Sequence, residues 1–177
     1  RRILPSYPEE YKNLQRIPFI SAADLNLPYS TLTKRNKRIG VYQSSAENPL
    51  TDVTYDPSEW LCLPLYCGTS LVYFYFSYKY AGTVLGLLNL FQKADIQDCN
   101  RLPDILIVFG GEKGTTTGTY FLDQKNSLLF GYVSDTEEAD YFGYVKKLVL
   151  TLHNLRMIHQ GALPIHGSMV EITLKGG

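Results

Sequence analysis

The chain has 177 residues, 45% of them hydrophobic, which is enough to bury one sizeable core and makes a single domain the expectation. Seventeen basic residues balance seventeen acidic ones, and this neutrality argues against a nucleic-acid backbone or an anionic membrane surface as a partner. Three cysteines without a C-x-x-C pair fit neither a disulfide framework nor a zinc site, which favours a reducing compartment.

No stretch reaches the roughly 18 to 20 consecutive apolar residues that a membrane-spanning helix needs, and the start lacks the apolar segment of a signal peptide. We therefore expect a cytoplasmic protein without membrane contact. The chain begins without Met and ends in two glycines directly after a strand-like run, so we expect these residues to be a piece of a longer protein.

Six prolines divide the first sixty residues, which restricts this leading segment to short elements packed on the core. The pattern predicts a short helix over residues 9–15 and a strand over residues 38–43. The basic cluster from Lys34 to Arg38 leads into that strand and is interpreted as a solvated loop.

The middle of the chain alternates between strand and helix patterns. Residues 71–80 are β-branched or aromatic at nearly every position, which predicts a strand. Apolar residues at helical spacing over 84–93 predict a helix packed against it. The apolar run 105–109 predicts a buried strand, and residues 119–122 and 128–133 flank a turn-rich segment and predict a hairpin.

A long helix is predicted over residues 140–159, where the apolar residues recur at helical spacing, and Gly161 ends it. Alternation of polar and apolar residues then predicts a strand over 165–174. Strands before and after helices predict a single α/β domain with a mixed β-sheet and flanking helices.

The glycine- and threonine-rich run over residues 110–119 resembles a phosphate-binding loop at first sight, because glycine exposes backbone amides. A P-loop needs the pattern G-x-x-x-x-G-K-[ST], and here Lys113 precedes Gly114. We interpret the run as a loop followed by a strand.

A second group of polar residues lies near the C-terminus. Tyr141, Lys146 and Lys147 lie near the start of the predicted long helix, and His166 and Ser168 lie at the start of the last predicted strand. A helix followed by a returning strand can bring both places to one edge of a sheet, where ligands bind in open α/β folds. The spacing therefore makes these residues candidates for a site.

The segments that contain them resemble a known family. DYFGYVKK, at residues 140–147, is similar to the W-Y-[GA]-G-E-M-K-K segment of ATP-dependent phosphoenolpyruvate carboxykinases. LPIHGSMVEI, at residues 163–172, is similar to their segment centred on M-H-C-S-A-N, and the distance between the two segments matches. The second segment also resembles the H-G-x-x-V-x-[VI] strand that precedes the P-loop of the related HPr kinase/phosphorylase family. The resemblance implies an N-terminal lobe that ends before its P-loop.

The same resemblance assigns roles to individual residues. Tyr141 is expected near a carboxylated substrate, and Lys146 and Ser168 are expected as further substrate contacts. Lys147 and His166 are expected to be catalytic residues that share a divalent metal, Mn or Mg. In these enzymes such a metal bridges the substrate and the γ-phosphate of ATP during phosphoryl transfer.

Three functions remain open at this point. The first is the substrate- and metal-side lobe of a carboxykinase-like enzyme that uses ATP, and the second is a lobe of a P-loop kinase related to HPr kinase that acts on a small-molecule or protein hydroxyl. The third is a noncatalytic binding or scaffold domain. For either enzyme the partners would be a small-molecule substrate and a C-terminal lobe carrying the P-loop. Without that lobe we expect the chain to be inactive. We also expect its exposed apolar docking face to self-associate.

Overall fold

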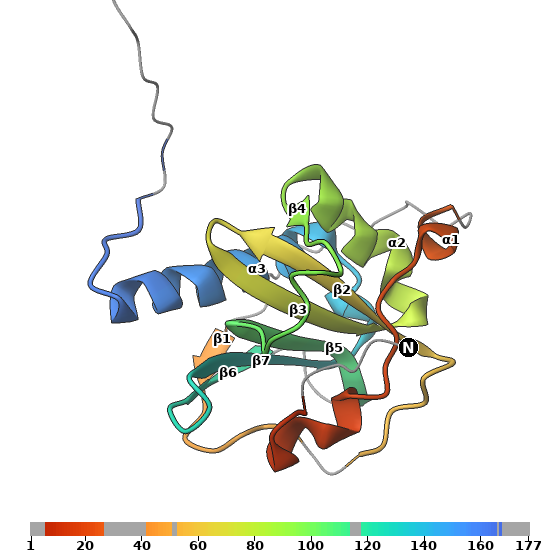
Figure 1. Cartoon of the computed structure of the whole chain (residues 1–177), viewed down its shortest axis with the longest axis horizontal. Helices are drawn as coiled ribbons and strands as arrows, with labels where there is room; N and C mark the ends of the chain where they lie inside the picture. Colours follow the sequence, from red (N-terminus) through yellow and green to blue (C-terminus); the bar gives the residue numbers. More distant parts are fainter. Residues whose placement is uncertain (1–5, 27–41, 51–52, 114–117, 166, 168–177) are drawn as a thin grey trace, which may run out of the picture.

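The computed structural model describes residues 6–26, 42–50, 53–113, 118–165 and 167 (Figure 1). Its centre is one mixed β-sheet of seven strands: β1 (Tyr42–Ser44), β2 (Trp60–Cys67), β3 (Ser70–Ser77), β4 (Gln92–Lys93), β5 (Ile105–Lys113), β6 (Gly118–Asp123) and β7 (Leu128–Asp135). The strand order is β1-β6-β7-β5-β3-β2-β4. With the helices that flank this sheet, the structure confirms the α/β class and the mixed sheet predicted from the sequence.

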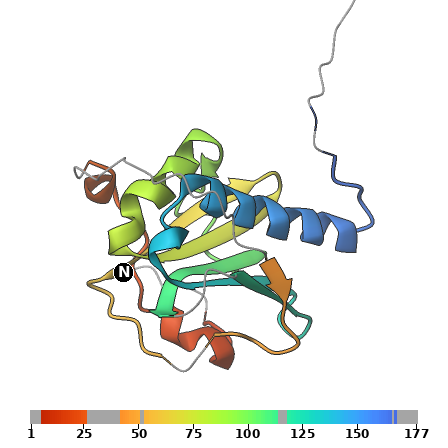
Figure 2. The same ribbon diagram turned by 180° about the vertical axis from the view of Figure 1, so that it is seen from behind.

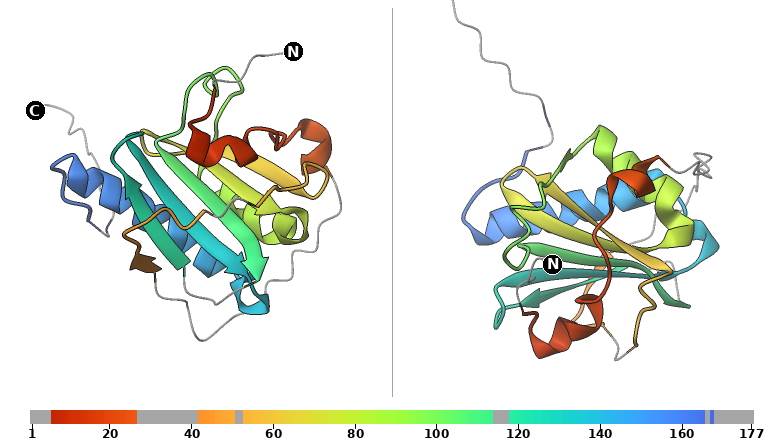
Figure 3. Two further views of the ribbon diagram at one scale, coloured as in Figure 1. Left: turned by 90° about the horizontal axis from the view of Figure 1, so that it is seen from below. Right: turned by 45° about the vertical axis from the view of Figure 1, so that its right-hand side comes forward.

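The helical elements are short except for the last one. They are η1 (Glu9–Leu14), α1 (Ala22–Leu25), η2 (Tyr78–Tyr80), α2 (Ala81–Val84), η3 (Leu85–Asn89), η4 (Glu137–Ala139) and α3 (Phe142–His159). Figure 2 shows α3 lying across one face of the sheet beside α2, and the left view of Figure 3 shows η1 on the opposite face. In the part of the chain that is described, no helix is both long and apolar enough to cross a bilayer.

Three parallel strands form the middle of the sheet. β3 pairs with β5 and β5 with β7, so that Phe74 lies opposite Ile107 and Ile107 opposite Gly131. β2 is antiparallel to β3, and β6 is antiparallel to β7. The carboxyl ends of β3, β5 and β7 therefore meet at one edge, and the chain leaves β7 at this edge to begin α3.

The central strands are buried on both faces, which explains their continuous apolar composition. In β3, Phe74 and Phe76 belong to the core under α3, whereas Tyr73 and Tyr75 belong to a second core on the other face. The N-terminal strap, defined as residues 6–20, covers this second core. A sheet of this kind needs a layer on each face because both sets of side chains must leave water.

Polar contacts fix the N-terminal strap in place. The hydroxyls of Tyr7 and Tyr75 form a hydrogen bond with each other, and the Tyr11 hydroxyl donates to Asp123 Oδ2 at 2.8 Å. The N–H of Ile20 donates to the carbonyl of Cys62 at 2.9 Å, which covers part of the outer edge of β2. Buried hydroxyls need such partners, since an unpaired one costs free energy.

Several elements differ from the sequence-based predictions. The helix predicted over 84–93 ends at Asn89, and β4 follows at the sheet edge. β2 was not predicted, because Pro64 interrupts its pattern and cannot donate a ladder hydrogen bond. Of the strand predicted over 38–43, residues 38–41 lie outside the described residues. The strand predicted over 165–174 also lies outside them, except for residues 165 and 167.

The second half of α3 is tied to the turn between β2 and β3. His153 Nδ1 lies 3.1 Å from Ser70 Oγ, and Gly68 in the turn has a φ of +57°. A Cβ at Gly68 would lie 3.1 Å from Cε1 of His153, so the imidazole packs closely on the turn. Burial, and secondly the charge of Arg156, lower the pKa of His153 below its usual value.

This lowered pKa predicts a pH-dependent stability. The unfolded chain binds a proton at His153 more readily than the folded one, so the free energy of unfolding should fall as the pH decreases below about 6.5, the usual histidine pKa. Urea unfolding between about pH 8 and pH 5 measures the slope. His153→Gln should flatten it relative to the wild type, and an identical slope in both proteins would contradict the assignment.

Gly110 and Gly161 provide a matched pair for a second prediction. Both have positive φ, +79° and +81°, but a Cβ at Gly110 would lie 2.3 Å from Cε2 of Tyr80, whereas nothing lies within 4 Å of one at Gly161. Gly161→Ala should cost about 1 kcal/mol from its backbone conformation alone. Gly110→Ala should cost clearly more, because the Tyr80 ring must move. Equal losses on urea unfolding would contradict the clash.

Candidate functional site

A pocket lies at the edge where the carboxyl ends of β3, β5 and β7 meet. It has a volume of about 280 Å³ and is lined by Lys79, Tyr80, Asp135, Glu137 and Asp140. We call it the carboxyl-edge pocket. Ligands of open α/β sheets bind at this kind of edge, so its position makes it a candidate site.

Asp135 is the centre of the hydrogen bonds in this pocket. It accepts a hydrogen bond from the Tyr80 hydroxyl at 2.6 Å and forms an ion pair with Lys79. The Tyr80 hydroxyl is also 3.0 Å from the carbonyl oxygen of Thr136. Burial, and then the hydrogen bond and charge of Asp135, raise the pKa of Tyr80 well above its usual value. Tyr80 therefore remains a hydrogen-bond donor at neutral pH.

The charge of the carboxyl-edge pocket limits what it can bind. Asp135, Glu137 and Asp140 contribute three carboxylates and Lys79 one ammonium, which gives a formal charge of −2. Asp140 also accepts a hydrogen bond from the hydroxyl of Thr83. Such a pocket repels a bare polyanion and suits a hydroxyl or a positively charged group. Binding of an anion at this edge therefore depends on cations outside the pocket.

Lys146 and Lys147, in the second turn of α3, are the two lysines among the predicted site residues. Lys147 is exposed, and its Nζ lies 5.8 Å from the centre of the Tyr42 ring, a cation–π contact. Lys146 is half-buried beside it in the sequence. Tyr141 is half-buried immediately before α3, and a Cβ at Gly143 would lie 2.6 Å from its ring.

The structure does not bring Tyr141 and Lys147 together on one face of α3. Lys147 lies six positions after Tyr141, and Tyr141 precedes the helix with an extended backbone (φ −139°, ψ 120°). Tyr141 packs against the core under α3, whereas Lys147 lies over Tyr42 in β1. The predicted site residues on α3 therefore flank the carboxyl edge instead of converging on a single point.

Tyr42 is a neighbour of the site to which the sequence analysis gave no role. Its hydroxyl donates to the carbonyl oxygen of Tyr144 at 2.7 Å, and the two rings lie 5.1 Å apart. Burial, and then the neighbouring Tyr144, raise the pKa of Tyr42 well above its usual value. The ring under Lys147 is thus held firmly, and no local sequence signal connects two residues so far apart in the chain.

The predicted metal centre cannot be assembled from the residues that the structure describes. His166 and Ser168 lie outside them. Within them, no group of three or more histidine, cysteine, aspartate or glutamate side chains could hold a metal ion. Of the two predicted metal ligands, Lys147 and His166, only Lys147 is among the described residues. Its position over an aromatic ring suits an ammonium cation, whereas a metal ligand needs the free lone pair of an amine.

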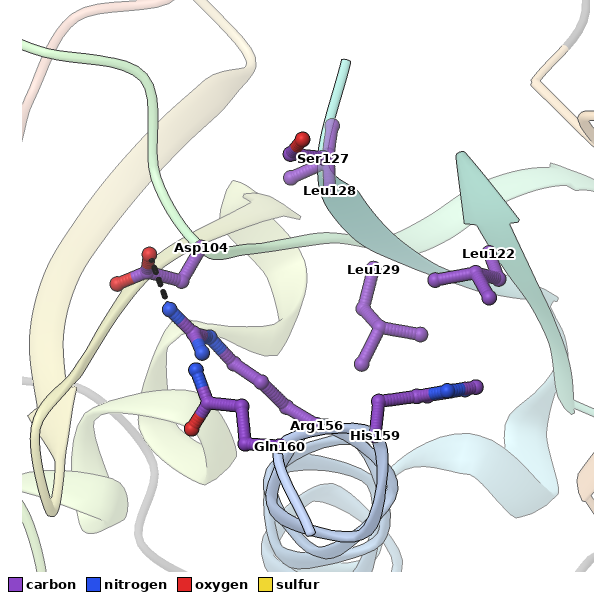
Figure 4. A pocket seen from close by; sticks show the side chains of 8 residues that line it. All are labelled: Asp104, Leu122, Ser127, Leu128, Leu129, Arg156, His159 and Gln160. Atoms are coloured by element: carbon purple, nitrogen blue, oxygen red, sulfur yellow. Dashed lines mark hydrogen bonds and ion pairs between the residues drawn. The ribbon is translucent and has the colours of Figure 1, made fainter. Parts of the chain in front are cut away.

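A second concave region lies at the other end of α3, and Figure 4 shows it. It is lined by Asp104, Leu122, Ser127, Leu128, Leu129, Arg156, His159 and Gln160, and we call it the helix-end cleft. Asp104 directly precedes β5, and the last three residues of the lining come from the C-terminal end of α3. None of these residues belongs to a motif from which the sequence predicts a site.

Asp104 connects three parts of the fold at this cleft. It accepts hydrogen bonds from Arg156 Nη2 at 2.7 Å, from Arg101 Nη2 at 3.1 Å and from the N–H of Leu71 at 2.8 Å. Burial of the carboxyl opposes its ionisation, but these hydrogen bonds outweigh it and hold the pKa of Asp104 below its usual value. Asp104 is therefore ionised at neutral pH and satisfied by its partners.

Known proteins give no further guide to either region. Comparison of the chain with models of protein families, with curated protein sequences and with solved structures finds no match. A function for this chain is therefore proposed from the chemistry of its own residues and from the resemblance of residues 140–147 and 163–172 to short family motifs.

Proposed function

We propose that this domain is the substrate-side lobe of a phosphotransfer enzyme similar to ATP-dependent phosphoenolpyruvate carboxykinases. The observation that supports this best is the position of Lys146 and Lys147. They lie in the second turn of α3, the helix that begins at the carboxyl edge of the three parallel strands. Their positive charges add to the partial positive charge of the helix N-terminus and so favour an anionic substrate.

The substrate class that fits these lysines is a small carboxylate or phosphorylated carboxylate. Lys147 is exposed and can contact such an anion while its ammonium stays over the Tyr42 ring. Lys146 is expected to provide a second cation, and Tyr141 a polar hydroxyl at the helix start. Phosphoryl transfer depends mainly on positioning and on stabilisation of charge, and these residues would contribute the positioning of the acceptor.

The requirement for ATP and a divalent metal remains a prediction from the resemblance. A second lobe would contribute the phosphate-binding loop. Leu163 and Ile165, which follow α3, are 83% and 81% exposed and offer it apolar surface. Self-association of the chain through such surface is likewise still a prediction.

Binding of anionic substrates to the present chain is a direct test of the proposal. Oxaloacetate and phosphoenolpyruvate should each bind, and Lys146→Ala or Lys147→Ala should weaken binding about tenfold, because each removes a charge-assisted contact. Calorimetric titration measures the dissociation constants. Lys125→Ala is the matched control. Lys125 is an exposed lysine in the turn between β6 and β7, and it pairs with Glu10 of η1. Equal losses in all three variants would contradict a specific site.

The metal and nucleotide need the longest natural chain that contains these residues. Manganese and ATP binding should be lost in its Lys147→Ala and His166→Ala variants if both residues serve phosphoryl transfer. Unchanged binding in both variants would contradict the enzyme proposal and favour a scaffold domain. If binding is lost in both variants, comparison of oxaloacetate with hydroxyl acceptors would separate a carboxykinase-like enzyme from a kinase related to HPr kinase.

A further inference from the structure

The helix-end cleft is a small cavity with an apolar floor and a polar rim. Its volume is about 240 Å³, below the roughly 300–1,000 Å³ typical of pockets for drug-sized ligands, so a ligand held there must be small. Leu122 and Leu129 from the β6–β7 hairpin form the floor, whereas the side chain of Leu128 belongs to the core on the other face of the sheet. In Figure 4, Arg156 and Gln160 reach toward the Asp104 side of the cleft, and His159 extends below Leu129 and Leu122.

The polar rim is fixed by the way α3 ends. Gly161, at a φ of +81°, donates its N–H to the carbonyl of Ile158 at 3.0 Å, and Ala162 donates to the carbonyl of Met157 at 2.9 Å. These two bonds form a Schellman motif. They satisfy two carbonyls that the helix C-terminus would otherwise leave without donors. The backbone of His159 and Gln160 is thereby held at the rim in a defined position.

The guanidinium of Arg156 has unused capacity to bind an anion. In the described part of the chain it makes one hydrogen bond, from Nη2 to Asp104, although a guanidinium has five N–H donors. Asp104 is also bound by Arg101, so two guanidinium groups face one carboxylate and leave one net positive charge. The ion pair fixes the position of Arg156 without neutralising the cleft.

We propose that the helix-end cleft binds a small aliphatic carboxylate. Its carboxylate would accept hydrogen bonds from Arg156 and from the imidazole or amide at the rim, and its alkyl group would lie on Leu122 and Leu129. A phosphate ion fits less well, because the leucine floor leaves part of its oxygens without donors. A neutral amide of the same shape would lose the charge-assisted contact with Arg156. This site lies at the opposite end of α3 from Lys146 and Lys147 and does not depend on the function proposed for them.

Titration of the isotope-labelled chain with isovalerate tests the proposal, with isovaleramide and inorganic phosphate as comparison ligands. Isovalerate should cause saturating shifts of the methyl resonances of Leu122 and Leu129. Isovaleramide and phosphate should bind at least about tenfold more weakly, the ratio expected for loss of one charge-assisted hydrogen bond. Absence of saturable shifts with isovalerate, or equal binding of either comparison ligand, would overturn the proposal.

Variants of the rim identify the residues that hold the carboxylate. Arg156→Leu should weaken isovalerate binding about tenfold or more, while Arg101 and the Leu71 N–H still satisfy Asp104. His159→Ala leaves the Asp104 contacts intact and should weaken binding in the same direction, which keeps the test valid if Arg156→Leu does not fold. Arg16→Ala is the control, because Arg16 is an exposed arginine on the N-terminal strap. The assignment would be overturned if His159→Ala and a folded Arg156 variant both bound isovalerate with wild-type affinity. Arg156→Leu is that variant, or Arg156→Lys if Arg156→Leu does not fold.

Discussion

Burial of the three central strands on both faces is the constraint on which the rest of this structure depends. β3, β5 and β7 carry large apolar side chains at successive positions, so neither face of the sheet can be left to water. The molecule meets this requirement with unequal layers. One face is covered by α3 together with α2 and η3, and the other by the N-terminal strap, which contributes aromatic side chains from a segment with little regular structure.

Asp104 provides polar contacts that connect the three central strands with α3. Its backbone N–H donates to the carbonyl of Leu71, and its own carbonyl accepts from the N–H of Leu129, so it joins the starts of all three central strands. Its side chain adds Arg156 from α3. Through these contacts this single residue couples the register of the sheet to the position of the helix.

The sequence indicated those parts of the fold whose signal is local. β3, α3 and the start of β5 were predicted near their observed bounds because uninterrupted apolar or aromatic runs and helical periodicity depend on neighbouring residues alone. β5 continues to Lys113, through residues that were interpreted as a loop. β2 was missed, because Pro64 masks a strand that pairs along its whole length with β3. The role of the leading segment as a second core layer depends on contacts with distant strands, which periodicity cannot reveal.

The same distinction applies to the candidate sites. Lys146 and Lys147 could be singled out from a short motif, whereas the contact of Tyr42 with Tyr144 joins residues 102 positions apart. The ion pair of Asp104 with Arg156 spans 52 positions. α3 carries both regions, one near each end, and an 18-residue helix is roughly 27 Å long. Small ligands at the two ends would therefore not touch each other.

The N-terminal strap has a consequence for how the chain reaches its native state during synthesis. Tyr7 and Tyr11 leave the ribosome before their hydrogen-bond partners, Tyr75 and Asp123, which follow 68 and 112 residues later. At a synthesis rate of about 5–20 residues per second, Tyr11 waits roughly 6 to 20 seconds for Asp123. During that interval the aromatic side chains of the strap have only an incomplete sheet to cover, because β6 and β7 have not yet been made. The nascent chain therefore exposes the aromatic side chains of the strap until β6 has been made, and contacts of such long sequence separation make the docking of the strap a late and slow folding step.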